Sequence, residues 1–105
     1  MKLSIVLSVQ QAQFEAVAFK GNLAANLEKI AGWGYDGVEL AVRDPRAMDL
    51  EELAALLAGC RLAVPAIGTG QAWGEDRLSF SDPNPEVRRA AIERANSHVA
   101  LAARL

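Results

Sequence analysis

The chain has 105 residues, of which 51% are hydrophobic and 23% are charged, and its formal net charge is −2. This apolar fraction excludes a disordered chain, because it is large enough to build a core. The slight negative charge and the single histidine differ from the basic footprint of a nucleic-acid binder. No window approaches the ~20 apolar residues of a membrane span. We therefore expect a soluble domain that has neither nucleic acid nor a membrane as its partner.

The single cysteine and the N-terminal residues bear on the compartment. Cys60 can form neither an internal disulfide nor a cysteine-rich zinc site, which favours a reducing, cytoplasmic location. Residues 1–9 (MKLSIVLSV) place a lysine before an apolar stretch, as a signal peptide does. Because the stretch is short and interrupted by serines, we interpret it as a first β-strand over residues 3–8, covered on both faces.

A helix and a second strand follow. Asn22 is the predicted N-cap of a helix whose apolar stripe consists of Leu23, Leu27, Ile30 and Ala31. Gly34 is its predicted C-terminal glycine. Residues 36–40 (DGVEL) are then predicted to form the second strand.

The next helix and strand repeat this order. Residues 49–52 (DLEE) resemble a capping box, in which Asp49 and Glu52 cap each other. The helix that follows should bury Leu50, Leu53, Ala54 and Leu57 and end at Gly59. Residues 62–67 are the predicted third strand, in which Pro65 should lie at an irregularity or where its missing amide has no partner.

A long loop over residues 68–84 precedes the last predicted helix. Asn84 and Pro85 open this helix, whose periodic positions are Val87, Ala91, Ala95, Val99 and Ala102. Strands that alternate with helices in this way predict right-handed crossovers around a parallel sheet, in the order of the chain and with the first two helices on one face. Because the pattern continues to Leu105, we expect residues 1–105 to be one partial domain that stops within its third helix.

Several segments resemble the xylose isomerase-like TIM barrels. The resemblance is carried by residues 2–5 (KLSI), residues 30–40 (IAGWGYDGVEL), the third strand ending in Gly68, and residues 82–92 (DPNPEVRRAAI). It spans the chain but only the first three of eight strand–helix units, and a complete barrel needs ~250 residues. It implies an N-terminal part of a TIM barrel, completed by self-association or by a missing C-terminal part.

The resemblance also implies a function. Members of this superfamily include sugar and sugar-phosphate isomerases and epimerases, which move a proton next to a carbonyl through an enediolate. The complete enzyme would use a divalent metal (Mn, Mg, Zn or Co) held on later strands, so we expect no catalytic residue and no metal ligand in this chain. Two alternatives stay open: an endonuclease IV-like DNA repair nuclease, against which Glu75 and Asp76 argue, and a non-catalytic assembly module of partial barrels.

Glu39 is the first candidate substrate contact, near the carboxyl end of the second strand, where barrel enzymes build their sites. Val38 and Leu40 suit the helix-covered face, so strand parity places Glu39 on the opposite face, toward the barrel mouth. There its carboxylate would accept hydrogen bonds from sugar hydroxyls. The alternative is a structural pair with Arg43 or with a lysine of a later strand.

The glycine-rich segment after the third strand supplies the other candidates. Residues 68–74 (GTGQAWG) fail the dinucleotide-binding pattern, because the third glycine comes one place late and no helix is predicted there. We interpret the segment as a loop in which Gly68 and Thr69 let a substrate approach the backbone. Trp73 would be an apolar wall against a sugar ring or, equally, a loop anchor.

The remaining polar and aromatic candidates have simpler interpretations. Arg43, Asp44 and Arg46 form either an anion-binding loop or, as we favour, a solvated one. Trp33 is expected to pack at the opposite end of the sheet. His98 lacks a metal-ligating neighbour at helical spacing and is assigned to the helix surface or to helix packing. Cys60 is expected to be a small buried filler.

Overall fold

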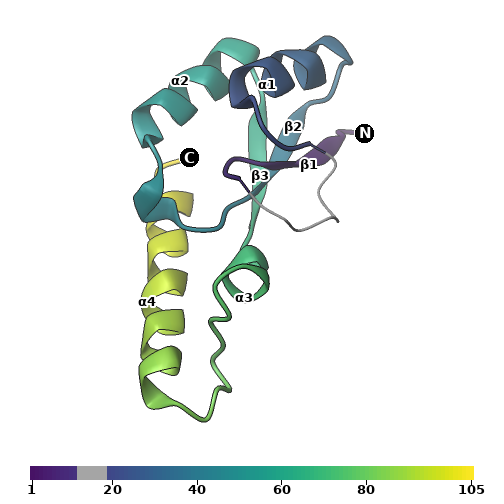
Figure 1. Ribbon diagram of the computed structural model, residues 1–105. Helices are drawn as coiled ribbons and strands as arrows, with labels where there is room; N and C mark the ends of the chain where they lie inside the picture. The colour runs from purple at the N-terminus through teal and green to yellow at the C-terminus, as the bar shows by residue number, and fades with distance from the viewer. Residues whose placement is uncertain (12–18) are drawn as a thin grey trace.

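The computed structural model describes residues 1–11 and 19–105, which form a three-stranded parallel sheet with helices (Figure 1). The strands are β1 (Ser4–Ser8), β2 (Gly37–Ala41) and β3 (Ala63–Gly68), hydrogen-bonded in the order β1-β2-β3. The helices are α1 (Leu23–Gly32), the 3₁₀ turn η1 (Pro45–Ala47), α2 (Leu50–Cys60), α3 (Gln71–Gly74) and α4 (Pro85–Ala102). The predicted α/β class, strand direction and strand order are confirmed.

The predicted N-caps begin the three long helices. The side-chain oxygen of Asn22 accepts a hydrogen bond from the amide of Ala25 at 3.1 Å, and that of Asp49 accepts one from Glu52 at 2.9 Å. Asn84 caps α4 through the amide of Glu86 at 2.9 Å. Such a cap contributes about 1 kcal/mol. Short-range chemistry thus sets where these helices begin.

Helices α1 and α2 lie together over one face of the sheet, as predicted (Figure 1). The core between them consists of Leu7, Val38 and Leu40 from the strands and Leu27, Ile30, Leu53 and Leu57 from the helices. Each fully buried leucine or isoleucine contributes roughly 1.5–3 kcal/mol of hydrophobic free energy. This layer holds β1, β2 and β3 in register.

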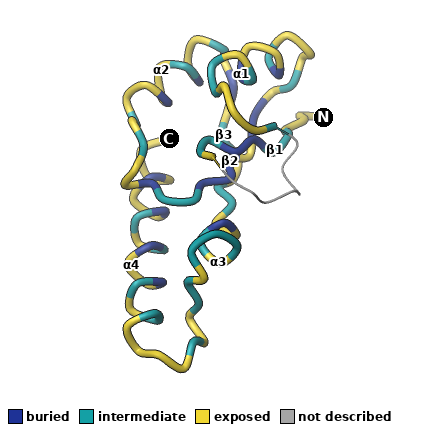
Figure 2. The backbone as a smooth tube through the Cα atoms, in the orientation of Figure 1, coloured by how far each residue is buried: buried dark blue, intermediate teal, exposed yellow. Residues whose placement is uncertain are grey.

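The opposite face of the sheet is largely open (Figure 2). Val6, Glu39 and Ala66 lie side by side on this face, where Val6 is half-buried and the other two are exposed. Our expectation that β1 is covered on both faces holds at its carboxyl end, where Ser8 on this face is 1% exposed, and fails at its start, where Ser4 is exposed. The serine and alanine content of this face explains why it tolerates exposure.

Pro65 lies at a break in the sheet register, as predicted. Gly37 pairs with Ala63 but Glu39 pairs with Ala66, so β3 has one more residue than β2 between these pairs. A bulge of this kind accommodates a residue that lacks an amide proton. The bulge leaves the carboxyl-terminal half of β3 in regular register beside β2.

Two predictions for α2 are wrong. Gly59 does not end the helix, which continues to Cys60 and is capped by Arg61 in the left-handed conformation, with φ +56°. The amide of Leu62 donates to the carbonyl of Leu57 at 3.1 Å and closes the end of the helix. Ala54 is exposed, because the face toward α1 and the sheet is filled by the larger Leu53 and Leu57.

At α1 the predicted C-terminal Gly34 does follow the helix, with φ +82°.

Helix α4 also differs from the prediction. It ends at Ala102 rather than running to Leu105, and its buried residues are Ala91, Arg94, His98 and Leu101. Val99, predicted to be buried, is 69% exposed. The reason is that α4 packs against the polar segment after β2 and η1 rather than on an apolar sheet. A polar stripe therefore faces inward.

Candidate functional site

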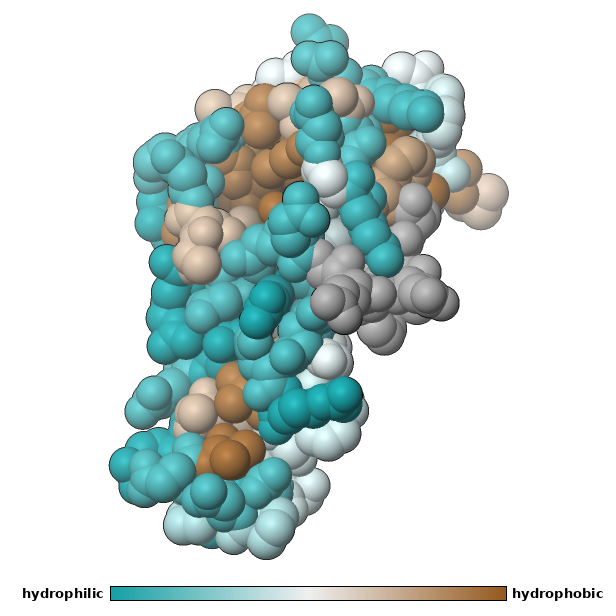
Figure 3. Space-filling model, in the orientation of Figure 1, coloured by the Kyte–Doolittle hydropathy of each residue, from teal (hydrophilic) through white to brown (hydrophobic). Residues whose placement is uncertain are grey.

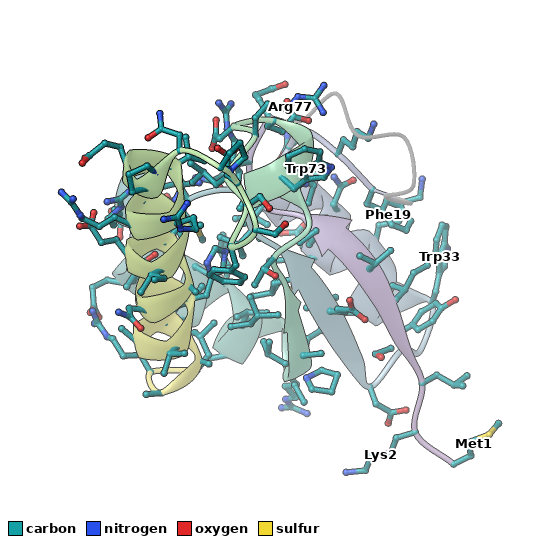
Figure 4. The ribbon with its side chains drawn as sticks, turned by 90° about the horizontal axis from the view of Figure 1, so that it is seen from below. Met1, Lys2, Phe19, Trp33, Trp73 and Arg77 are labelled. Carbon is teal, nitrogen blue, oxygen red and sulfur yellow. The ribbon has the colours of Figure 1, made fainter. Side chains whose placement is uncertain are left out.

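The carboxyl-terminal edge of the sheet brings together most of the predicted site residues. Ser8, Ala41 and Gly68 end the three strands on one level of the sheet, on the same face as Glu39. The segments after β2 and β3 continue from this level and meet beside α4. Figure 4 looks onto the open face, with α3 and Trp73 at the ends of the strands.

The Glu39 side chain leaves the sheet on the open face. Val38 and Leu40 are fully buried under the helices, whereas Glu39 is exposed, as strand parity predicted. A Cβ atom built on Gly68 would lie 3.4 Å from Glu39 Oε1, so the carboxylate extends over that glycine. No described residue forms a hydrogen bond or ion pair with Glu39, and Arg43, the structural partner considered above, binds Asp76 instead. Glu39 therefore presents an available acceptor next to Gly68.

A buried amide network lies beneath this edge. Gln71 is 2% exposed and its Nε2 donates to Ser8 Oγ at 3.0 Å; that hydroxyl donates to the carbonyl of Gln10 at 2.8 Å. The Gln10 side chain in turn accepts from the amides of Arg43 and Asp44, both at 2.8 Å. Gln71 Oε1 is buried and accepts no hydrogen bond from any residue that the structure describes. This network fixes α3 and the segment after β2 onto β1.

A second network is ionic and joins three elements. Asp76 accepts from Arg43 Nε at 3.0 Å, forms an ion pair with Arg43 Nη2, and accepts from Arg94 Nη1 at 2.8 Å. Arg94, whose side chain is 9% exposed, also pairs with Asp44 at 3.2 Å and donates to the carbonyl of Arg43 at 2.7 Å. Hydrogen bonds from Arg43, then those from Arg94, lower the pKa of Asp76 to about 2. The hydrogen bond from Arg46 lowers the pKa of Asp44.

These contacts revise the interpretation of residues 43–46 as a solvated loop. Arg43 and Asp44 are held by Asp76, Arg94 and Gln10, and only Arg46, which is paired with Asp44, remains more than half exposed. We call the set Arg43, Asp44, Asp76 and Arg94 the ion cluster. The ion pairs of this cluster join three parts of the chain: the segment after β2, the segment after α3, and helix α4.

The glycine-rich segment contains an element that was not predicted. A single helical turn, α3, begins at Gln71, contrary to the expectation of a continuous loop. Thr69 is exposed, and Trp73 is 55% exposed with the Arg77 guanidinium 5.4 Å from its ring centroid. Trp73 is therefore not anchored in the core.

Thr69 and Trp73 also line a cavity of about 270 Å³ between α3 and α4. The apolar part of its wall comes from Leu78, Phe80, Ala91 and Ala95. In Figure 3 apolar side chains reach the surface at this end of the molecule. The cavity is open at one side, where Phe80 is 65% exposed.

The other candidates have structural surroundings. His98 is buried, and its two ring nitrogens lie 2.8 Å from the carbonyl of Arg94 and 2.9 Å from that of Val42, which confirms helix packing. The expectation that Trp33 packs in the interior is wrong: it is 58% exposed and contacts the Phe19 ring and Lys29 at the surface. Cys60 is half-buried against the core.

Sequence reasoning missed Gln10, Gln71 and Arg94, and it considered Asp76 only as an acidic loop residue. One available signal was topological. Arg43 and Asp76 follow neighbouring parallel strands, and such segments meet at one edge of a sheet. For Gln71 and Arg94 no such signal existed, because their partners are distant in sequence and are backbone or side-chain groups of other segments.

No protein-family model matches the sequence, and no curated protein matches it significantly.

Within residues 1–11 and 19–105, no helix is long and apolar enough to cross a membrane. The same described residues contain no group of three His, Cys, Asp or Glu side chains placed to hold a metal ion.

Proposed function

We propose that this chain forms the N-terminal, substrate-contacting part of a sugar or sugar-phosphate isomerase or epimerase with a TIM-barrel architecture. The observation that carries the proposal is the available carboxylate of Glu39 beside Gly68, on the open face at the carboxyl edge of a parallel sheet. Barrel enzymes bind substrates at this edge, and a carboxylate there accepts hydrogen bonds from vicinal hydroxyls.

Each site residue then has a distinct task. Glu39 binds substrate hydroxyls, and the bare backbone at Gly68 and Thr69 allows close approach of a sugar. Trp73, half exposed near the strand ends, offers an apolar surface to the C–H face of the ring. None of these residues is assigned the proton transfer itself, which belongs to the reaction class of enediolate chemistry.

The divalent metal that the resemblance implies has no fitting ligand set among the described residues. We therefore derive no step through a metal in this chain. Residues from the remainder of such a barrel would hold it, with Mn, Mg, Zn and Co as the candidates. We place the complete enzyme in the cytoplasm, on the strength of the single, unpaired Cys60.

The open face and the outer edges of the sheet support a barrel partner. β1 and β3 are the outer strands; Phe19 bridges β1 at Leu7 and accepts from the amide of Ser8 at 2.9 Å, and the other edge positions are templates for further pairing. Either a C-terminal barrel part or a second copy of the chain would cover them. The same observation supports the second candidate function, a non-catalytic assembly module of partial barrels.

The nuclease alternative is not favoured at this edge. Arg43 and Arg94 are paired with Asp44 and Asp76, so these guanidiniums are compensated by carboxylates rather than offered to a phosphate backbone.

Sugar binding by Glu39→Gln tests the proposal. We expect the wild-type chain to bind D-xylose or D-fructose weakly, with NMR shifts at the amides of Gly68 and Thr69, and the variant to bind about tenfold more weakly, since it loses a charged hydrogen-bond acceptor. Glu86→Gln, an exposed carboxylate on α4, is the matched control. If Glu39→Gln lost stability but kept normal sugar binding, Glu39 would be structural and the proposal wrong.

A further inference from the structure

The cavity between α3 and α4 has an apolar wall that the proposed function does not use. Its volume is about 270 Å³, and this wall consists of Leu78 and Phe80 after α3 and of Ala91 and Ala95 on α4. Figure 1 shows the segment after α3 turning back beside α4, which places the cavity between them. The two alanines have small side chains, so they leave space that the larger residues after α3 do not fill.

Two aromatic side chains border this cavity without filling it. Trp73 is 55% exposed and Phe80 is 65% exposed. Large apolar side chains left in water forgo the hydrophobic free energy that burial provides. Both rings are therefore surfaces that an occupant of the cavity would cover.

The conformation of Arg77 keeps one of these rings at the wall. Its φ is +56°, in the left-handed region where glycine is the usual residue at the end of a helix. The amide of Arg77 donates to the carbonyl of Trp73 at 3.0 Å, and its guanidinium lies 5.4 Å from the centroid of the Trp73 ring. This contact holds the ring at the boundary of the cavity, because the cation and the aromatic face attract each other.

Arg94 and His98 also border the cavity, but their polar atoms bind elsewhere. The ring nitrogens of His98 lie 2.8 and 2.9 Å from two backbone carbonyls. The Arg94 guanidinium binds Asp44 and Asp76 through its Nη atoms, and its Nε is closed to solvent. An ionic occupant would lose hydration without gaining an uncommitted charge from the described lining residues. The lining therefore favours a neutral occupant.

We infer that this cavity is a binding site for a small, neutral aromatic molecule of about ten non-hydrogen atoms. An apolar cavity of about 150 Å³ holds benzene, so this one has room for a two-ring compound. Contacts between aromatic rings at Trp73 and Phe80 add to the burial of apolar surface. Thr69, which is exposed and borders the cavity, offers a hydroxyl to one polar group such as the N–H of indole. The inference goes beyond the proposed function, since it requires neither Glu39 nor a sugar.

Titration of the full chain with indole tests this inference. The amide signals of Leu78, Ala91 and Ala95 in NMR spectra report on the cavity. We expect saturable shifts with a Kd on the order of 1 mM, as suits so small a ligand in a cavity open at one side. Ala95→Leu places a larger side chain in the cavity and should weaken binding about tenfold or more. Ala102→Leu, an exposed substitution on the same helix, is the matched control and should leave the Kd unchanged.

Phe80→Ala is the second variant, because removal of an exposed ring leaves the core intact even if Ala95→Leu fails to fold. We expect it to weaken indole binding about fivefold. Absence of saturable shifts in the wild-type chain, or an unchanged Kd in Phe80→Ala, would overturn the inference.

Two further measurements test the occupant. Cyclohexanol that bound as tightly as indole would overturn the aromatic class. Shifts at the same amides that grew with protein concentration in the absence of indole would show that a second copy of the chain covers the cavity, which would also overturn the inference. Sugar binding at Gly68 is measured separately, so each of these results leaves the proposed function standing.

Discussion

Asp76→Asn removes the carboxylate that joins Arg43 to Arg94 and should lower stability at neutral pH. The pKa of Asp76 falls from 3.8 to about 2 in the folded chain, and roughly 1.4 kcal/mol per pKa unit gives an upper bound on the order of 2 kcal/mol. The Asp76 side chain is 20% exposed and that of Arg43 is 41% exposed, so solvent screening reduces this value. We expect a loss of about 1–2 kcal/mol.

The sign of the pH dependence follows from the lowered pKa. A carboxyl group whose folded-state pKa is depressed contributes its stability above the unfolded-state value, here 3.8, and loses it as the pH falls toward about 2. The free energy of unfolding of wild type should therefore exceed that of Asp76→Asn by the largest amount above pH 5. At pH 2 the two free energies should be nearly equal. Asp44, whose pKa is also lowered, shares Arg94 with Asp76, so Asp44→Asn is measured beside Asp76→Asn to separate the two carboxylates.

Urea unfolding followed by circular dichroism at pH 7, 5, 3 and 2 measures the effect. All samples need the same protein concentration, because association shifts apparent stability. The matched control is Glu86→Gln, which breaks an exposed pair with Arg89 and should cost less than about 0.5 kcal/mol. Equal stability of Asp76→Asn and wild type at pH 7, or a difference that persisted at pH 2, would refute the role assigned to the ion cluster.

Three further predictions concern packing, assembly and metal binding. Gly37→Ala should destabilise the chain by about 1–3 kcal/mol, because the new Cβ would lie 2.6 Å from the carbonyl oxygen of Ala63. Gly59→Ala, in a helix with open space around it, should stabilise by about 0.5–1 kcal/mol; similar urea midpoints for the two variants would contradict this. Sedimentation of the purified chain should show association or incomplete folding, whereas a cooperatively unfolding monomer would contradict the role given to the open sheet edges. Calorimetric titration with Mn, Mg and Zn should show no tight site, and a stoichiometric micromolar site would mean that a ligand set had been missed.

Local sequence patterns predicted much of the fold correctly. Asn22, Asp49 and Asn84 were identified as caps because capping depends on contacts within a few residues. The side of the sheet taken by Glu39 followed from alternation along the strand, with Val38 and Leu40 as its reference. The break at Pro65 followed from its missing amide proton. Each of these depends on geometry that a short stretch of chain carries within itself.

The inward face of α4 and the networks at the site depend on what each element packs against. The apolar period pointed to Val99, yet α4 buries Arg94 and His98, because the opposing surface consists of carboxylates and carbonyls from the segments after β2 and α3. Gln71 is buried because α3 packs against the end of β1, where its side chain donates a hydrogen bond to Ser8, 63 residues earlier in the chain. These partners are distant in sequence, so no periodic pattern in the sequence indicates that they pair. They become neighbours only when the sheet brings the strand ends together.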